Sequence, residues 1–266
     1  MIAVCLIRRD PHYRRHAFET GLARAGYTLR DQARPTSRDD LLIIWNRYGA
    51  FEVQANEWER RGGTVLVCEN GYAGADKEGR QFYAMSVHAH NGAGWYPEGD
   101  GARFDALGLT VHPWREGGRA VVVRGQRGIG TAQMASPVRW HTNTAAALSK
   151  RQPYPVRCIE HPGRHAPNPT PDQYLSDAAA CVIWASSVGV RALLLGIPVF
   201  YDAPYWICQM GARRLRESPD LTDPMRNDES RLYALRRMAW AQWSVAEIES
   251  GEPFKRLAEY PAFVQW

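Results

Sequence analysis

Unbroken apolar runs separated by helical stretches are the feature that most constrains how this chain can fold. Residues 2–7, 41–45 and 64–68 form three such runs. A helical pattern that ends at Gly26 separates the first two, and residues 52–61 form a second helical stretch before the third run. Strands that are apolar on both sides are typical of a parallel sheet covered by helices on both faces. The sequence therefore predicts an α/β protein.

A change of character near residues 115–120 divides the chain into two halves. Residues 69–118 are rich in Gly, His, Asn and aromatic residues, with one expected strand at 82–87. Strand-and-helix alternation then resumes, with strands expected at 120–123, 156–159, 181–184 and 198–201. We predict two small doubly wound, Rossmann-like domains facing a cleft: residues 1–118, and residues 119–266 with closing helices at the end.

Composition excludes several classes of protein. The chain has 266 residues, 45% of them hydrophobic, and 33 Lys and Arg against 28 Asp and Glu, so it can bury a large core and is not disordered. No apolar run reaches the roughly 18 residues of a membrane span, and the chain does not start with a signal-peptide pattern. We therefore expect a cytoplasmic location, in the host if a phage encodes the protein. The five cysteines are isolated, which favours neither disulfides nor a cysteine zinc site.

Three loops that follow expected strands contain residues suited to phosphate binding. Ligands of open α/β sheets bind beyond the carboxyl ends of the strands. Ser186 and Ser187 begin a helix there, and we expect Gly189 to allow close approach of an anion. The second loop offers His161 and Arg164, and the third offers Gln126 and Arg127. Each loop alone is a weak signal, but together they predict a diphosphate site.

These motifs resemble a known family. His161-Pro-Gly, the following strand and Ser186-Ser-Val-Gly-Val-Arg-Ala-Leu-Leu-Leu-Gly-Ile-Pro-Val resemble the donor-binding half of GT-B glycosyltransferases. The likeness is greatest to the capsule-polysaccharide type and related phage-encoded enzymes, and residues 241–251 are similar to their closing segment. The resemblance covers about residues 120–251. Arg191 stands where many of these enzymes have a glutamate that binds the ribose of the donor.

The resemblance implies a metal-independent transfer of sugar. A nucleotide-sugar, expected to be a UDP-sugar, would be a substrate, and no cofactor or metal would be needed. The leaving diphosphate would be stabilised by main-chain N–H groups and by Arg or His side chains where charge develops. The absence of an Asp-x-Asp motif agrees with this expectation.

A sugar-transfer reaction also needs a general base, which we expect from the first half of the chain. Glu69 follows the third apolar run and opens the turn-like sequence Glu-Asn-Gly-Tyr, so we predict Glu69 as the base, with Asn70 and Tyr72 contacting the acceptor. A carboxylate that only caps this turn is the structural alternative. His88 and His90 are rival bases, or two ligands of a metal whose third ligand has no recognisable spacing.

The acceptor follows from weaker signals. Arg8 and Arg9 belong to a basic cluster after the first strand and are expected to contact the acceptor. The mild positive charge and the aromatic segment favour a hydroxymethylated pyrimidine in DNA, which an enzyme must flip out of the duplex to modify. The alternatives are a saccharide acceptor of the capsule or lipopolysaccharide type, a nucleotide-sugar epimerase of the same fold, and a nucleic-acid-binding module without catalysis.

Overall fold

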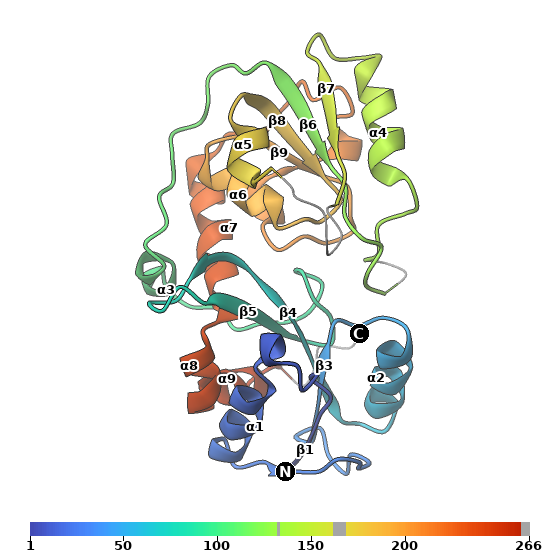
Figure 1. The fold of residues 1–266 in the computed structure, drawn as a ribbon, viewed down its shortest axis with the longest axis vertical. Helices are drawn as coiled ribbons and strands as arrows, with labels where there is room; N and C mark the ends of the chain where they lie inside the picture. The colour runs from blue at the N-terminus through green and yellow to red at the C-terminus, as the bar shows by residue number, and fades with distance from the viewer. Residues whose placement is uncertain (132–133, 162–168, 262–266) are drawn as a thin grey trace. The chain divides into compact units, whose positions relative to one another are not determined.

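The structure is a computed structural model that describes residues 1–131, 134–161 and 169–261. The chain forms two compact units (Figure 1). Unit 1 comprises Met1–Arg103 and Ala239–Trp266, and unit 2 comprises Phe104–Met238. None of the helices in these described ranges is long and apolar enough to span a lipid bilayer.

Unit 1 is built around a sheet with the strand order β11-β5-β4-β3-β1-β2. The first four strands along the chain run parallel, whereas β5 pairs antiparallel with β4, and β11 pairs antiparallel with β5. The strands are β1 (Ile2–Cys5), β2 (Thr28–Leu29), β3 (Leu41–Trp45), β4 (Thr64–Ala75), β5 (Gln81–Val87) and β11 (Gln242–Trp243). The helices are α1 (Arg15–Arg24), α2 (Ala50–Arg60), α8 (Val245–Ser250) and α9 (Glu252–Ala258), while α3 (Ala102–Ala106) contains the boundary to unit 2.

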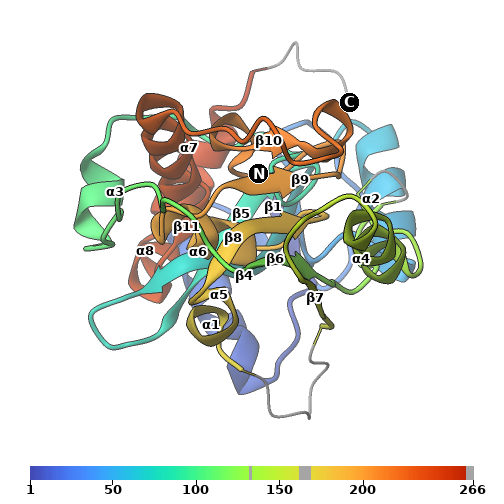
Figure 2. The ribbon, with the colours of Figure 1, turned by 90° about the horizontal axis from the view of Figure 1, so that it is seen from above.

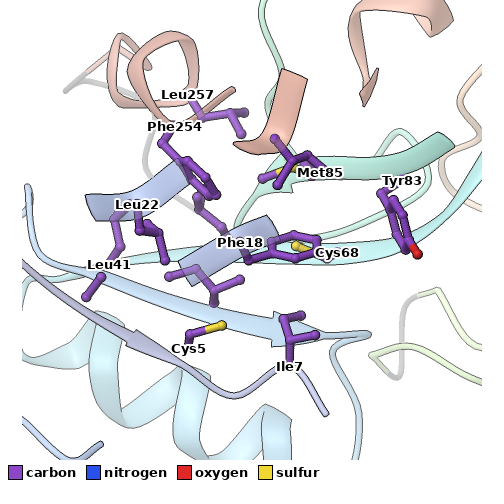
Figure 3. Close-up of a cluster of buried hydrophobic side chains, with 14 of the residues drawn as sticks. Cys5, Ile7, Phe18, Leu22, Leu41, Cys68, Tyr83, Met85, Phe254 and Leu257 are labelled. Atoms are coloured by element: carbon purple, nitrogen blue, oxygen red, sulfur yellow. The ribbon is translucent and has the colours of Figure 1, made fainter. Parts of the chain in front are cut away.

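Alternation of side chains along the strands builds a core on each face of this sheet. One core joins α1, α8 and α9 to alternate strand residues, and it contains Phe18 of α1, Cys68 of β4 and Phe254 of α9 (Figure 3). The other core joins Trp58 of α2 to Val65 of β4, and α2 lies on the opposite side of the sheet (Figure 1). This two-sided burial explains why the strands read as unbroken apolar runs.

Unit 2 is an all-parallel sheet with the order β10-β9-β8-β6-β7. Its strands are β6 (Ala120–Arg124), β7 (Val156–Ile159), β8 (Ala178–Ile183), β9 (Val199–Tyr201) and β10 (Arg213–Arg214). Its helices are α4 (Trp140–Ser149), α5 (Pro171–Leu175), α6 (Val188–Leu194) and α7 (Asp228–Trp240), whose last two residues belong to unit 1. The chain adds β7 on one side of β6 and β8 on the other, so α4 covers one face and α5 and α6 cover the other (Figure 2).

The compact units differ from the expected domains in two ways. Unit 2 begins near residue 104 rather than 119, and the end of the chain belongs to unit 1. The reason for the second difference is pairing: Gln242 and Trp243 of β11 lie opposite Ala84 and Tyr83 of β5. Side chains of α8 and α9 also enter the core beside α1. A two-residue strand gives almost no signal in a sequence, so only the fold reveals where the chain ends up.

Strand β4 differs from the expected strand at 64–68 because it continues through the Glu-Asn-Gly-Tyr sequence to Ala75. Its second half forms a hairpin with β5, and the turn lies at Asp76–Gly79, whose backbone N–H groups and carbonyls pair. Gly71 lies within an irregular part of the strand, where a Cβ atom would approach Phe82 to 2.7 Å. The glycine is therefore required by a neighbouring strand, and not by a turn.

Candidate functional site

The order of the strands in unit 2 places a switch point between β6 and β8. The chain leaves β6 toward β7 on one side and returns to β8 on the other, which is the arrangement at whose carboxyl edge α/β proteins bind ligands. The loops after these two strands carry Gln126 and Arg127, and Ser186 and Ser187. Gln126 Oε1 accepts a hydrogen bond of 3.0 Å from the Ala185 N–H, so the two loops are joined across the switch point.

A group of cationic and imidazole side chains gathers at this edge. Arg124 is 7% exposed at the end of β6, and its guanidinium donates to the carbonyls of Ile159 and Glu160 at the end of β7. His161 follows β7 and is half-buried. Burial lowers the pKa of His161, and the positive charges of Arg127 and Arg124 lower it further. The three side chains are therefore close enough to interact electrostatically.

Arg124 is the residue that the sequence interpretation missed. It is buried, its Nε has no hydrogen-bond partner among the described residues, and no ion pair with a carboxylate is found for it there. Its guanidinium instead lies 5.6 Å from the centre of the Tyr174 ring. A buried cation without a counter-ion is costly unless an anion neutralises it. The available signal was an arginine closing an otherwise apolar strand.

The other residues predicted to bind the donor lie in different surroundings. Ser186 is half-buried, and its Oγ accepts from the Val188 N–H at 3.3 Å; Ser187 is exposed and makes no capping bond through its side chain. Arg164 lies outside the described residues. A Cβ at Gly189 would lie 2.6 Å from Ile183 and from the Trp206 ring, so packing by itself explains the glycine, and its role in ligand approach stays a prediction. Gly189 is needed for packing.

Arg191 has a partner of its own within unit 2. Its Nε and Nη2 donate to the two carboxylate oxygens of Asp172 at 2.6 and 2.7 Å. The hydrogen bond and the charge of Arg191 lower the pKa of Asp172. The arginine at this position thus holds a carboxylate from α5 beside it.

In unit 1, Glu69 lies inside β4 opposite Ala84 and is half-buried. The Tyr72 hydroxyl donates to Glu69 Oε1 at 2.9 Å. Burial raises the pKa of Tyr72 well above its usual value, and the Glu69 carboxylate raises it further. The backbone N–H of Asn91 donates to the same phenol oxygen and acts in the opposite direction. The segment after β5 that contains His90 therefore returns to the neighbourhood of Glu69.

The two rival histidines have different surroundings. The His88 N–H donates to the Val65 carbonyl near the start of β4, so the antiparallel course of β5 carries His88 away from Glu69 to the opposite edge of the sheet. Its Nδ1 lies 2.6 Å from Glu59 Oε1 in a part-buried pair that Arg47 completes. His90 is 6% exposed, and its Nδ1 has no partner among the described residues.

Neither histidine belongs to a metal centre in the described ranges, where no three His, Cys, Asp or Glu side chains are placed to hold an ion. The remaining acceptor-site predictions are dispersed over unit 1. The Asn70 Oδ1 accepts from Gln81 Nε2 at 2.9 Å in the exposed hairpin. Arg8 and Arg9 are exposed after β1, which is two strands away from β4. Glu69 and Tyr72 are thus the predicted pair that the fold brings into direct contact.

Comparisons with known proteins were made on sequence and on structure. No family model matches the chain, and no curated protein sequence does. Among solved structures it is similar to KpsC of Thermosulfurimonas dismutans, once as the β-Kdo 2,7-transferase (TM-score 0.55) and once as the β-Kdo 2,4-transferase (TM-score 0.51). In both cases the identity is 13%, and the match covers 88% of this chain and 89% of the other.

These neighbours confirm the resemblance to capsule-type transferases at the level of the fold. Neither neighbour is named as an enzyme of DNA, so the DNA acceptor expected from the sequence finds no support, and the capsule-type alternative fits better. The described chain therefore has the α/β fold of the capsule Kdo transferases.

Proposed function

We propose that this protein is a glycosyltransferase that moves a sugar from a nucleotide-sugar to a hydroxyl group of a saccharide. Unit 2 binds the phosphate of the donor, and Glu69 of unit 1 is the general base. The observation that carries the proposal is the convergence of Arg124, Arg127 and His161 at the switch point of the unit 2 sheet.

The chemistry of these three groups suits a donor phosphate. Guanidinium groups bind phosphate oxygens in pairs, and a buried guanidinium binds them more tightly because water competes less. With its pKa lowered, His161 is neutral at physiological pH and offers an N–H donor or a lone pair. The hydrogen bond between Gln126 and Ala185 holds the two loops in place, which reduces the reorganisation needed when the ligand binds.

Transfer requires one bond to form and one to break. The base removes the proton of the acceptor hydroxyl, whose oxygen bonds to the anomeric carbon. The bond between that carbon and the donor phosphate breaks, and the nucleotide leaves with the electron pair. Arginine side chains stabilise the negative charge that develops on the leaving phosphate. Glu69 is suited to the first step because its carboxylate is half-buried and already accepts a hydrogen bond.

The substrates follow from the neighbours. The two KpsC structures are named as a β-Kdo 2,7-transferase and a β-Kdo 2,4-transferase, so we propose a saccharide acceptor and include Kdo among the donor sugars to be tested. The nucleotide expected from the sequence is UDP, and it remains part of the proposal. Metal-independence and a cytoplasmic location are likewise proposals.

The test combines binding and product analysis. Calorimetry with a panel of nucleoside mono- and diphosphates identifies the donor nucleotide. The protein is then incubated with activated sugars and either oligosaccharides or hydroxymethylated duplex DNA. Mass spectrometry measures the mass of each acceptor before and after the reaction. We expect a gain of one sugar on the oligosaccharide. Addition of a sugar to DNA would reverse the choice of acceptor. Isomerisation of the donor in the absence of any acceptor would indicate an epimerase. Absence of nucleotide binding would overturn the proposed donor site.

A further inference from the structure

The hydrogen bond between Tyr72 and Glu69 depends on an irregularity in β4. In a regular strand, residues three apart point to opposite faces of the sheet. The pairing of β4 with β5 loses its register between Asn70 and Ala75, and this shift lets the Tyr72 phenol reach the carboxylate of Glu69 at 2.9 Å. The contact therefore occurs where the regular pairing of the hairpin is interrupted.

The irregular segment is held from the other end of the chain. Gln242 of β11 is fully buried, and its Oε1 accepts from the N–H groups of Tyr72 (2.8 Å) and Ala73 (3.2 Å). Its Nε2 donates to the Ala73 carbonyl at 2.7 Å. One side-chain amide thus binds three backbone groups of the irregular segment. The backbone that carries the phenol is held rigidly.

The phenol itself has one proton to donate. The Asn91 N–H donates to the phenol oxygen, so the hydroxyl proton is directed to Glu69. The Tyr72 phenol and the Cys68 thiol are titratable groups that interact with Glu69, and Tyr96 interacts with the phenol. Glu69 has no ion pair among the described residues. The phenol is thus a hydrogen-bond donor that holds this carboxylate.

We propose that Tyr72 is a positioning residue that aims the Glu69 carboxylate so that it can accept the proton of the sugar acceptor. This inference rests on the proposed function, because it assumes that Glu69 is the base. A hydrogen bond from a phenol on an anchored backbone fixes the direction in which the carboxylate points. Without the phenol, the Glu69 carboxylate would be free to rotate.

The test uses Tyr72→Phe, which removes one oxygen and leaves the ring in place. Tyr83→Phe is the matched control, because Tyr83 lies in the paired strand β5 and its hydroxyl donates to the His12 carbonyl at 2.7 Å without touching Glu69. Two measurements are made on the full chain, for Tyr72→Phe, for Glu69→Ala and for the double variant. One gives kcat and KM for sugar transfer, and the other gives the free energy of unfolding.

In Tyr72→Phe we expect kcat to fall about tenfold because the base is no longer aimed. The KM for the donor stays unchanged, and Tyr83→Phe changes neither quantity. In the Glu69→Ala background, Tyr72→Phe should cause no further loss of kcat, because the phenol acts through the carboxylate. An unchanged kcat, or an equal loss in both backgrounds, overturns the inference, because a merely structural tyrosine would act independently of Glu69. If the wild-type protein transfers no sugar, the proposed function fails, and the free energies of unfolding of the same variants still decide whether Tyr72 and Glu69 are coupled.

Discussion

The two units order their first five strands in the same way, but the direction of the fifth strand differs. In unit 2 the fifth strand, β10, is parallel, so each strand ends in a loop at the same edge, and the cationic group of Arg124, Arg127 and His161 gathers there. In unit 1 the fifth strand, β5, is antiparallel and forms a hairpin with β4. That hairpin carries the carboxylate of Glu69 and its tyrosine.

This difference shows how sheets with the same strand order can present groups of opposite charge. A parallel edge exposes several loops that can each contribute a donor to an anion. A hairpin instead holds neighbouring side chains at fixed separations, which suits a single base and the group that orients it. The predictions that follow test separately the proposed base in unit 1 and the proposed phosphate-binding group in unit 2.

The largest effect is expected for the base. Glu69→Gln keeps the shape of the side chain but cannot accept a proton, so transfer should fall by two orders of magnitude or more while nucleotide affinity is unchanged. Steady-state kinetics and calorimetry give the two quantities. Glu78→Gln is the control, because Glu78 lies in the same hairpin on an exposed turn and pairs with Arg80. Equal turnover of both variants would remove Glu69 from this role.

A structural carboxylate of unit 1 gives the next largest effect. Asp40 is buried and accepts hydrogen bonds from the backbone of Ile2, Thr36 and Ser37. Asp40→Ala leaves these donors unpaired, and we expect a loss of about 2 to 4 kcal/mol in the free energy of unfolding. Hydrogen exchange should place the loss in unit 1, with unit 2 protected as before; a loss spread equally over both would show that they unfold as one.

The same residue makes a pH prediction. Burial alone would raise the pKa of Asp40, but the hydrogen bonds outweigh it and the net pKa is lowered. Its contribution to stability is therefore complete above the unfolded value of about 3.9 and is lost as the pH falls through the lower folded value. Denaturant titrations in acid should show this loss in the wild type and not in Asp40→Ala.

Gly189 in unit 2 separates packing from ligand binding. A methyl group at this position would lie too close to Ile183 and Trp206. Gly189→Ala should therefore lower the free energy of unfolding by about 2 kcal/mol. The folded fraction should bind nucleotide with wild-type affinity. Weaker binding without any loss of stability would support the role in ligand approach that the sequence suggested.

The smallest effect concerns the cationic group. Arg127→Ala should weaken nucleotide binding about tenfold, which corresponds to about 1.4 kcal/mol. Without that charge the pKa of His161 should rise, since Arg127 is one of the groups that lower it. Calorimetry and NMR of the imidazole measure the two changes. Arg151→Ala, which removes an exposed arginine paired with Asp220, should change neither.

Sequence reasoning reached most of the regular structure. The strand at Val156–Ile159 has the predicted bounds, and the helix expected to begin at Ser186 and Ser187 is α6, Val188–Leu194. Gln126 and His161 follow strands of unit 2 as expected, and their role in donor binding stays a prediction. Arg124 was missed because its place at the end of an apolar strand is a weak signal, which does not by itself distinguish a buried arginine from an exposed one.

Local pattern by itself determined the class of this protein: apolar runs in alternation with amphipathic stretches bury both faces of a sheet, and only an α/β architecture accommodates that. Tertiary structure decided where each strand end points. The antiparallel course of β5 separates His88 from Glu69, and Gln242 of β11 reaches back to the segment after Glu69. Contacts between residues 170 positions apart in the chain depend on how the strands are ordered, and that order is a property of the whole fold.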